Sequence, residues 1–251
     1  MRTLTCSLAL VAASLLSSRP ALADDKEVRD TLEKAIKAHG GADKLNKHLA
    51  STGNMKGKVH VMETTFEFTG EIASQAPDKL KVTIEFEAGG MAFKVIQVFN
   101  KDKGWASLNN TVMEMDKDQL AEAREELHAS EVTNRLTPLL DKEYKLSSLG
   151  EVKVNEKPAT GIQVTRKGYR DMNLYFDKKT NLLVKTERRV RDDMSKQEMT
   201  QEEFLEDHKD ISGLMVPQKL KIKRDGKDFL EGEMTDYKIL EKLPDDTFAK
   251  P

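Results

Sequence analysis

The serines of this sequence lack the setting that makes a serine nucleophilic. A serine hydrolase of the common kind carries its nucleophile in a G-x-S-x-G turn between a strand and a helix, next to an oriented histidine. That motif is absent from the sequence, and Ser107, Ser147 and Ser148 fall in segments with strand or loop character. The single cysteine, Cys6, lies close to the N-terminus. We therefore expect no nucleophilic catalysis.

Histidines and paired acids also lack a catalytic or metal-binding pattern. Zinc hydrolases place two histidines one helical turn apart beside a glutamate, as in H-E-x-x-H. The five histidines are isolated from one another: His39, His48, His60, His128 and His208. His39 and His48 flank predicted helix ends, where a histidine is more often a cap than a metal ligand. The pairs Asp192-Asp193, Asp207-His208 and Asp245-Asp246 are adjacent residues, which point to opposite faces in a strand or form turns. The sequence predicts no metal site, no cofactor and no enzyme.

Apolar ligand binding is the chemistry that remains open. Trp105 could stack on a ligand, although a lone tryptophan at the start of a strand more often packs in a core or at its rim. The eleven methionines would suit an adaptable apolar pocket, and several methionines also fill gaps in any core.

The first 23 residues are typical of a secretory signal peptide. Arg2 precedes an apolar run from Leu4 to Leu16, and Ala21-Leu22-Ala23 forms a small-x-small end. A membrane anchor needs about 20 apolar residues, more than this run provides. We expect cleavage after Ala23, with the neighbouring bonds as alternatives, and a periplasmic or secreted product with no transmembrane segment. Cys6 would leave with the signal peptide, so the exported chain has no thiol.

The charge distribution argues against a nucleic-acid partner. The chain has 41 Lys and Arg residues against 43 Asp and Glu residues, and its lysines alternate with acids along most predicted strands. Binding to nucleic acid requires a basic stripe or patch. This interleaving is typical of a solvated sheet face instead.

Helical spacing occurs at the start and in the middle of the chain. Asp24–Gly41 has one apolar stripe and ends at two glycines, and Ala42–Leu49 predicts a short second helix. Asp116–Leu140 predicts two short helices with a break near Ala129-Ser130. Its acids Glu122, Glu125 and Glu126 are interpreted as a solvated face.

A two-residue period fills the rest of the chain. Tyr169–Val190 reads as a hairpin around Asp177–Asn181, with Met172, Leu174 and Phe176 on its dry face, and we place it in the middle of the sheet. The connections are too short for parallel pairing. The predicted strands are Asn54–Met62, Thr65–Ser74, Lys79–Ala88, Met91–Asn100, Trp105–Leu108, Thr111–Met115, Tyr144–Ser148, Val152–Asn155, Thr160–Lys167, Asp171–Phe176, Leu182–Arg191, Glu198–His208, Leu214–Lys223 and Lys227–Leu240. Pro217 suggests an edge or a bulge, and Phe248 is expected to pack back onto the sheet. No linker divides residues 24–251, which predict a single mainly β (α+β) domain.

One strand is apolar on both sides. In Met91–Asn100, Phe93, Val95 and Phe99 on one face are matched by apolar residues on the other. A central strand under a helix explains this pattern better than a strand that lines a cavity, and both interpretations remain open.

This order of elements, together with the phrase YFDKKTNLLVKTE, resembles the outer-membrane lipoprotein-sorting family, the LolA/LolB-like superfamily. The helix end AHGGADKL also resembles uncharacterised exported bacterial proteins of this kind, and the resemblance extends from Asp24 to Pro251. It implies a strongly curved antiparallel sheet, or incomplete β-barrel, whose apolar concave face is covered by an N-terminal helix and mid-chain helices and holds acyl chains. Two features differ: Lys56 and Lys58 stand where sorting carriers use an arginine to hold the helical lid, and the receptor branch's lipid-anchored cysteine is missing.

We therefore expect non-catalytic binding of a lipid or lipoprotein acyl chain, in the service of envelope lipid or lipoprotein transport. The partners would be a lipid or acylated protein, together with envelope proteins. The alternative is an envelope protein–protein interaction module with a solid core and no small ligand. The expected cavity residues are Val82, Ile84, Phe86, Phe93, Val95 and Phe99 from the sheet, with Leu120 and Leu127 from the covering helices.

Overall fold

One large antiparallel sheet dominates the computed structural model, which describes residues 21–61, 63–192 and 195–251. Most of the predicted signal peptide, including Arg2 and Cys6, therefore lies outside the described residues. The helices are α1 (Ala21–Ala38), α2 (Ala42–Lys47) and α3 (Lys117–Arg135), with two 3-10 turns, η1 (Thr137–Leu140) and η2 (Asp245–Phe248). None of the described helices is long and apolar enough to cross a membrane.

The strands form a 13-stranded sheet and a separate small hairpin, β12–β13. Their bounds are β1 (Ala50–Val61), β2 (Thr64–Gln75), β3 (Lys79–Ala88), β4 (Met91–Asn100), β5 (Lys103–Leu108), β6 (Thr111–Glu114), β7 (Tyr144–Val154), β8 (Lys157–Arg166), β9 (Met172–Asp177), β10 (Leu183–Arg191), β11 (Glu198–Glu206), β12 (Lys209–Ile211), β13 (Leu214–Val216), β14 (Lys219–Arg224) and β15 (Lys227–Leu240). The order across the sheet is β6-β5-β4-β3-β2-β1-β15-β14-β11-β10-β9-β8-β7.

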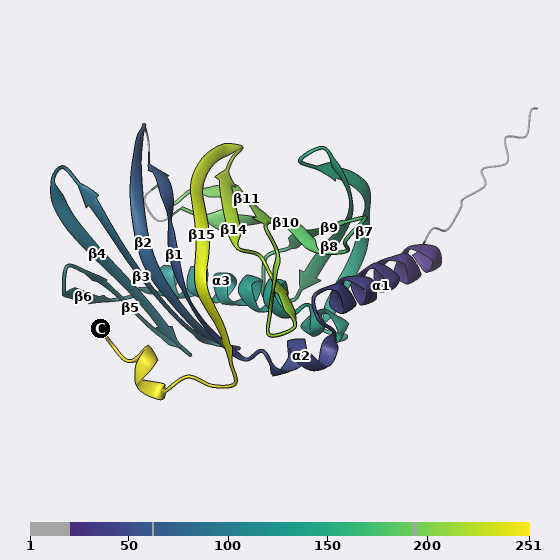
Figure 1. Ribbon diagram of the computed structural model, residues 1–251, viewed down its shortest axis with the longest axis horizontal. Helices are drawn as coiled ribbons and strands as arrows, with labels where there is room; N and C mark the ends of the chain where they lie inside the picture. Colours follow the sequence, from purple (N-terminus) through teal and green to yellow (C-terminus); the bar gives the residue numbers. More distant parts are fainter. Residues whose placement is uncertain (1–20, 62, 193–194) are drawn as a thin grey trace, which may run out of the picture.

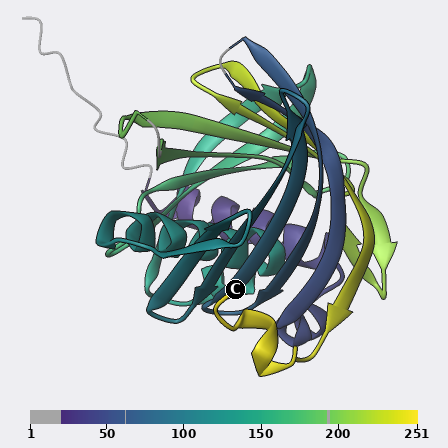
Figure 2. The same cartoon turned by 90° about the vertical axis from the view of Figure 1, so that its left-hand side faces the viewer.

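In this order the first and last strands of the chain are neighbours in the middle of the sheet. The two edge strands of the sheet follow each other in the sequence. β15 pairs with β1 at the centre, whereas the edge strands β6 and β7 are consecutive along the chain. The segment between them is α3 with η1, so this helix must cross from one edge of the sheet to the other. Figures 1 and 2 show the sheet curling around the helices without closing into a barrel.

Bulges and paired glycines allow the sheet to bend. Register shifts interrupt the pairing of β1, β7, β10 and β14, and such bulges bend and twist a strand. At the centre Gly57 lies opposite Gly232. A Cβ atom on Gly57 would lie 2.0 Å from the backbone oxygen of Glu231, so only glycine permits this approach of β1 and β15.

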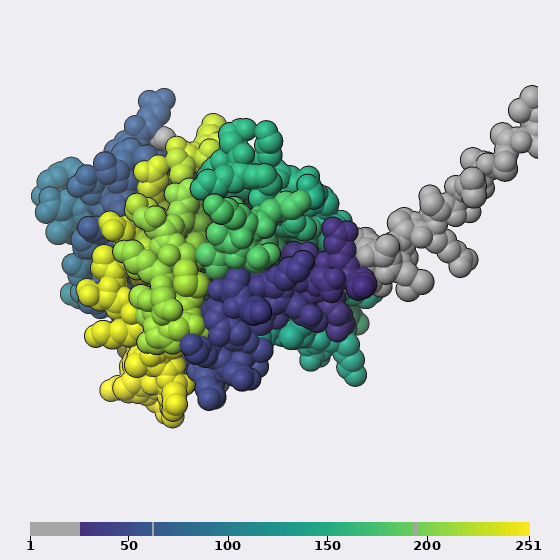
Figure 3. All heavy atoms as spheres, turned by 45° about the vertical axis from the view of Figure 1, so that its right-hand side comes forward, coloured from purple at the N-terminus to yellow at the C-terminus, as the bar shows by residue number. Residues whose placement is uncertain are grey.

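The main core lies between the helices and the strands β7–β10. α1 lies against this half of the molecule (Figure 3). Met172, Leu174 and Phe176 are buried there with Leu32 and Val132, which confirms the predicted dry face of the hairpin. A second cluster, on the opposite side of the sheet, contains Phe248 with Val98 and Leu243. The predicted packing of Phe248 onto the sheet is thus confirmed.

Several predicted boundaries are wrong for identifiable reasons. Asp116–Leu140 is not broken near Ala129-Ser130, because Ala129 and Val132 continue the buried stripe of α3 and the turn comes at Leu136, with φ 57°. The predicted strands at 144–148 and 152–155 form one bulged strand, β7. Leu214–Lys223 is divided into β13 and β14 around Pro217, which has no N–H to donate. The hairpin β9–β10 lies towards the β7 edge, away from the middle of the sheet.

Candidate functional site

The strand register defines which side chains share the side of the sheet that the helices cover, here called the inner face. Residues paired across antiparallel strands point to the same side. One row runs from Phe93 through Phe86, Phe68, Gly57, Gly232 and Leu220 to Leu205. On β11 Glu203 has the same facing as Leu205, and from Glu203 the row continues through Thr186 to the core residue Leu174. The apolar residues of β3 and β4 therefore lie on the same face as the helix-covered core.

All six predicted strand residues lie on the inner face of β3 and β4. Phe86 pairs with Phe93, and Ile84 pairs with Val95. The first five of the set are half-buried (Val82, Ile84, Phe86, Phe93 and Val95), while Phe99 is only 3% exposed. They form a continuous wall in which only the end nearest α3 is sealed.

The two predicted helix residues, Leu120 and Leu127, lie only at the end of this wall nearest α3, which is called its lower end. Leu127 is buried and borders the same hollow as Phe99. Leu120 lies close to β5, since a Cβ atom on Gly104 would be 3.0 Å from its Cδ2 atom. α3 thus covers the end of the wall at Phe99 and Gly104.

The inner face of β1–β6 is uncharged. Every described side chain that the register places on this side of the six strands is apolar, glycine or a neutral polar residue. The large apolar members are Met55, Val59, Val61, Phe66, Phe68, Ile72, Leu80, Val82, Ile84, Phe86, Met91, Phe93, Val95, Phe99, Leu108 and Met113. This composition is what an aliphatic ligand requires, because such a ligand offers no partner to a charge.

The outer face of the same strands is charged and self-paired. Cross-strand ion pairs join Lys56 to Glu233 at 3.4 Å, Lys58 to Glu67 at 3.6 Å and Lys94 to Glu85 at 2.8 Å. Trp105 is also on this side, partly buried against the Phe248 cluster, so it packs at a core rim. Charged side chains of β1–β6 are thus confined to the outer face, which also carries the apolar cluster around Phe248.

Two hollows adjoin the predicted residues, and neither contains all eight. The larger, of 1470 Å³, takes in Phe86 and Phe93 together with charged residues of β1, β2, β14 and β15. The smaller, of 500 Å³, lies beside α3 and takes in Phe99 and Leu127. The other four predicted residues, Val82, Ile84, Val95 and Leu120, line neither hollow, so the eight are not gathered around one cavity.

A polar aromatic stack borders the smaller hollow. The rings of His128 and Tyr169 stack with centroids 3.9 Å apart, and His128 Nε2 lies 3.2 Å from the hydroxyl of Tyr144. The Arg166 guanidinium lies over both tyrosine rings and pairs with Glu143 at 2.7 Å. Burial lowers the pKa of His128 to about 4, and the nearby arginines add to this effect. The ring is thus neutral at pH 7.

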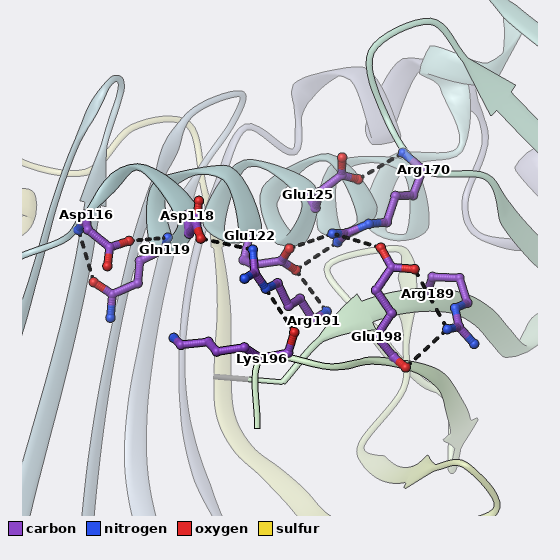
Figure 4. Close-up of polar contacts among 10 residues, drawn as sticks. All are labelled: Asp116, Asp118, Gln119, Glu122, Glu125, Arg170, Arg189, Arg191, Lys196 and Glu198. Atoms are coloured by element: carbon purple, nitrogen blue, oxygen red, sulfur yellow. Dashed lines mark hydrogen bonds and ion pairs between the residues drawn. The ribbon is translucent and has the colours of Figure 1, made fainter. Parts of the chain in front are cut away.

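Arginines from the opposite half of the sheet hold α3 in place (Figure 4). Arg170 binds Glu122 through two hydrogen bonds of 2.8 and 2.6 Å, and its backbone N–H donates to Glu125. Arg191 binds Asp118 at 3.0 Å. Burial alone would raise the pKa of Glu122, but the bonds from Arg170 and Arg191 bring it below its ordinary value.

The interpretation of the α3 acids as a solvated face is therefore wrong. Glu122 and Glu125 are half-buried and bonded, and Glu126 pairs with the buried Arg188. Their spacing of three and four residues places them on one helix face. That spacing, read together with the arginine-rich segment Glu187–Arg191, was the signal in the sequence for this contact.

Buried polar groups occupy the inner face between the core and the uncharged wall. Arg188 binds Glu203 at 3.4 Å, and Gln201 donates to Glu203 at 2.7 Å and accepts from Arg224 at 3.0 Å. Burial, together with the nearby Glu126, raises the pKa of Glu203. In the described part of the chain, no cluster of three or more His, Cys, Asp or Glu residues could hold a metal ion.

Comparison with known proteins identifies the fold. No family model matches the sequence, and no curated protein matches it. A LolA superfamily protein from Nitrosomonas europaea is similar in structure, with a TM-score of 0.58 and 14% identity over 89% of this chain and 97% of that one. A DUF1329 family protein from Desulfovibrio piger also has a TM-score of 0.58 and 14% identity, over 88% and 97%. An outer-membrane lipoprotein-sorting protein domain from Vibrio parahaemolyticus has a TM-score of 0.55 and 12% identity, over 90% and 97%. The chain has a LolA/LolB-like fold, as the sequence resemblance implies.

Proposed function

We propose that the inner face of this LolA-like half-barrel binds the aliphatic chain of a lipid or of an acylated protein, without catalysis. The single observation that carries the proposal is the uncharged, half-buried inner face of β1–β6, beside a core that already fills the β7–β10 half. Large contiguous apolar surfaces of this kind mark binding sites in soluble proteins. The fold shared with lipoprotein-sorting structures supports this assignment.

The energetics favour an acyl chain. Each methylene moved from water onto an apolar wall contributes about 0.8 kcal/mol. A 16-carbon chain therefore gains on the order of 10 kcal/mol, which leaves micromolar affinity after the costs of association and ordering. An export signal at residues 1–23 would place this activity in the periplasm or outside the cell, where lipid or lipoprotein transport in the envelope would use it.

Titration of a fluorescent 16-carbon fatty acid into the delipidated protein tests the proposal. We expect saturable binding by the parent and a loss of affinity of about tenfold in Phe93→Asn, because the amide removes apolar contact and has no partner on the wall. Ala92→Asn is the matched control, since Ala92 is the adjacent exposed residue on the outer face, and its affinity should equal that of the parent.

The outcomes separate the two functions considered for this chain. Absence of saturable binding by the parent would contradict acyl binding and leave the protein–protein interaction module as the better account. Equal affinity of parent and Phe93→Asn would contradict the location on the inner face.

A further inference from the structure

Three exposed apolar side chains lie along the free margin of the inner face that β4, β5 and β6 form. Met91 is 62% exposed, Met113 58% and Leu108 45%, and together they make up half of the exposed large hydrophobic residues among those described. Leu108 pairs with Val95, and Met113 pairs with Ala106 next to Gln97. Met91 lies on the part of β4 that β5 does not cover, four residues before Val95. The three residues are therefore spread along the free margin of β4–β6, where the uncharged wall ends.

The edge itself carries no charge on its inner face. β6 is a four-residue strand with no neighbour beyond it. Natural edge strands usually carry lysine, proline or an inward-pointing charge that discourages contact. On its inner face β6 has only Thr111 and Met113. At the opposite edge, α1 packs against β7 and the apolar residues join the core.

Other directions along the inner face are obstructed for an apolar chain. An acyl chain that moved towards β11 would meet Arg188, Gln201 and Glu203, and it could not replace the hydrogen bonds among them. Towards the lower end, α3 seals the wall at Phe99 and Gly104. Towards β6 the uncharged surface continues to the free edge of the sheet without meeting a charge or a helix.

We propose that acyl chains enter and leave the inner face over the free margin of β4–β6, which presents Met91, Leu108 and Met113. The proposal rests on the acyl binding proposed above and adds the route. Methionine suits this position, because its flexible, polarisable side chain adapts to a moving aliphatic partner.

Stopped-flow kinetics with the same fluorescent fatty acid test the route. The double variant Met91→Gln with Met113→Gln keeps side-chain length and introduces no charge. We expect its association and dissociation rate constants both to fall by about fivefold, because the amides raise the barrier to passage of an aliphatic chain over this margin. Ala92→Gln with Glu114→Gln is the matched control, since both residues are exposed neighbours on the outer face, and its rate constants should equal those of the parent.

A second measurement does not depend on these substitutions. Leu108→Cys in a chain with Cys6→Ser has a unique thiol, which an environment-sensitive fluorophore can report on. We expect the label signal to change before the final fluorescence level of bound ligand is reached. Rate constants of the double variant equal to the parent's, or a change in dissociation alone, would overturn the route while leaving acyl binding intact. Absence of binding by the parent would instead overturn the proposed function.

Discussion

His39 shows how a single buried residue makes the stability of this protein depend on pH. The backbone N–H of Leu183 donates to His39 Nε2 at 3.3 Å, so the ring hydrogen must be on Nδ1, which donates to the carbonyl of Ala35 at 2.8 Å. A second proton on Nε2 would face the Leu183 N–H. Burial accordingly lowers the pKa of His39 from 6.5 to about 4.

The sign of the effect follows from this lowered pKa. The unfolded chain binds a proton at His39 near pH 6.5 while the folded protein does not, so stability is lost as the pH falls from 6.5 towards 4. The loss for a shift of this size is up to about 3 kcal/mol. His39→Gln removes this titration, and its free energy of unfolding should fall less than that of the parent over the same interval. Urea unfolding at pH 7, 5.5 and 4.5 measures the difference; parallel curves for the two proteins would contradict the assignment.

The facing of individual side chains was predictable where apolar and polar residues alternate along a strand. Alternation placed Val82, Ile84 and Phe86 on one face of their strand and Phe93 and Val95 on one face of theirs. The register shows that the two sets share a face of the sheet. The bonds of Glu122, Glu125 and Glu126 were not predictable in this way, because their arginine partners lie 45 to 69 residues away along the chain. Helical spacing identifies a polar stripe but does not say what covers it.

At the scale of elements, α3 depends on contacts at both of its faces. Its apolar side joins the core through Leu127 and Val132, and its acidic side binds arginines of the β8–β9 turn and β10. Asp116 and Gln119 form a capping box at its first turn. The helix is therefore held against the sheet along its length, in the position of a cover for the lower end of the inner face.

Replacement of Arg170 tests this arrangement. In Arg170→Leu, Glu122 loses the two hydrogen bonds of the guanidinium, whereas the backbone N–H at position 170 still donates to Glu125. The turns of α3 around Glu122 should therefore exchange amide hydrogens faster than in the parent. The global free energy of unfolding should fall by only about 1 kcal/mol, because the ion pair is partly exposed. Hydrogen exchange of residues 117–126 measures the effect. Arg189→Leu is the control, since Arg189 is exposed and bonds to Thr200 and Glu198 instead; equal exchange in the two variants would contradict a specific role for Arg170.

Elements were predictable in type more than in extent. Alternation identified β3, β4 and β15 with their observed bounds, since polar turns mark both ends of each. The break in Asp116–Leu140 was misplaced, because small residues such as Ala129 resemble an interruption in the sequence and yet fill a tight contact in the core. Local pattern does not distinguish these two uses of a small side chain.

At the scale of the whole molecule, the decisive feature is the pairing of β1 with β15. The sequence predicted one curved antiparallel sheet but could not say where it begins, because this pairing joins residues more than 170 positions apart. Once β1 and β15 meet, β6 and β7 become the edges and α3 must bridge them. One half of the inner face is then filled by helices, and the other half remains an uncharged wall.

Native mass spectrometry of the exported protein tests the central claim most directly. The account expects the protein to carry, or to take up on incubation with a 16-carbon fatty acid, an adduct of defined stoichiometry with the mass of an aliphatic amphiphile. The adduct should be reduced in Phe93→Asn and retained in Ala92→Asn. A parent protein that shows no added mass, either as isolated or after incubation, would contradict acyl binding on the inner face.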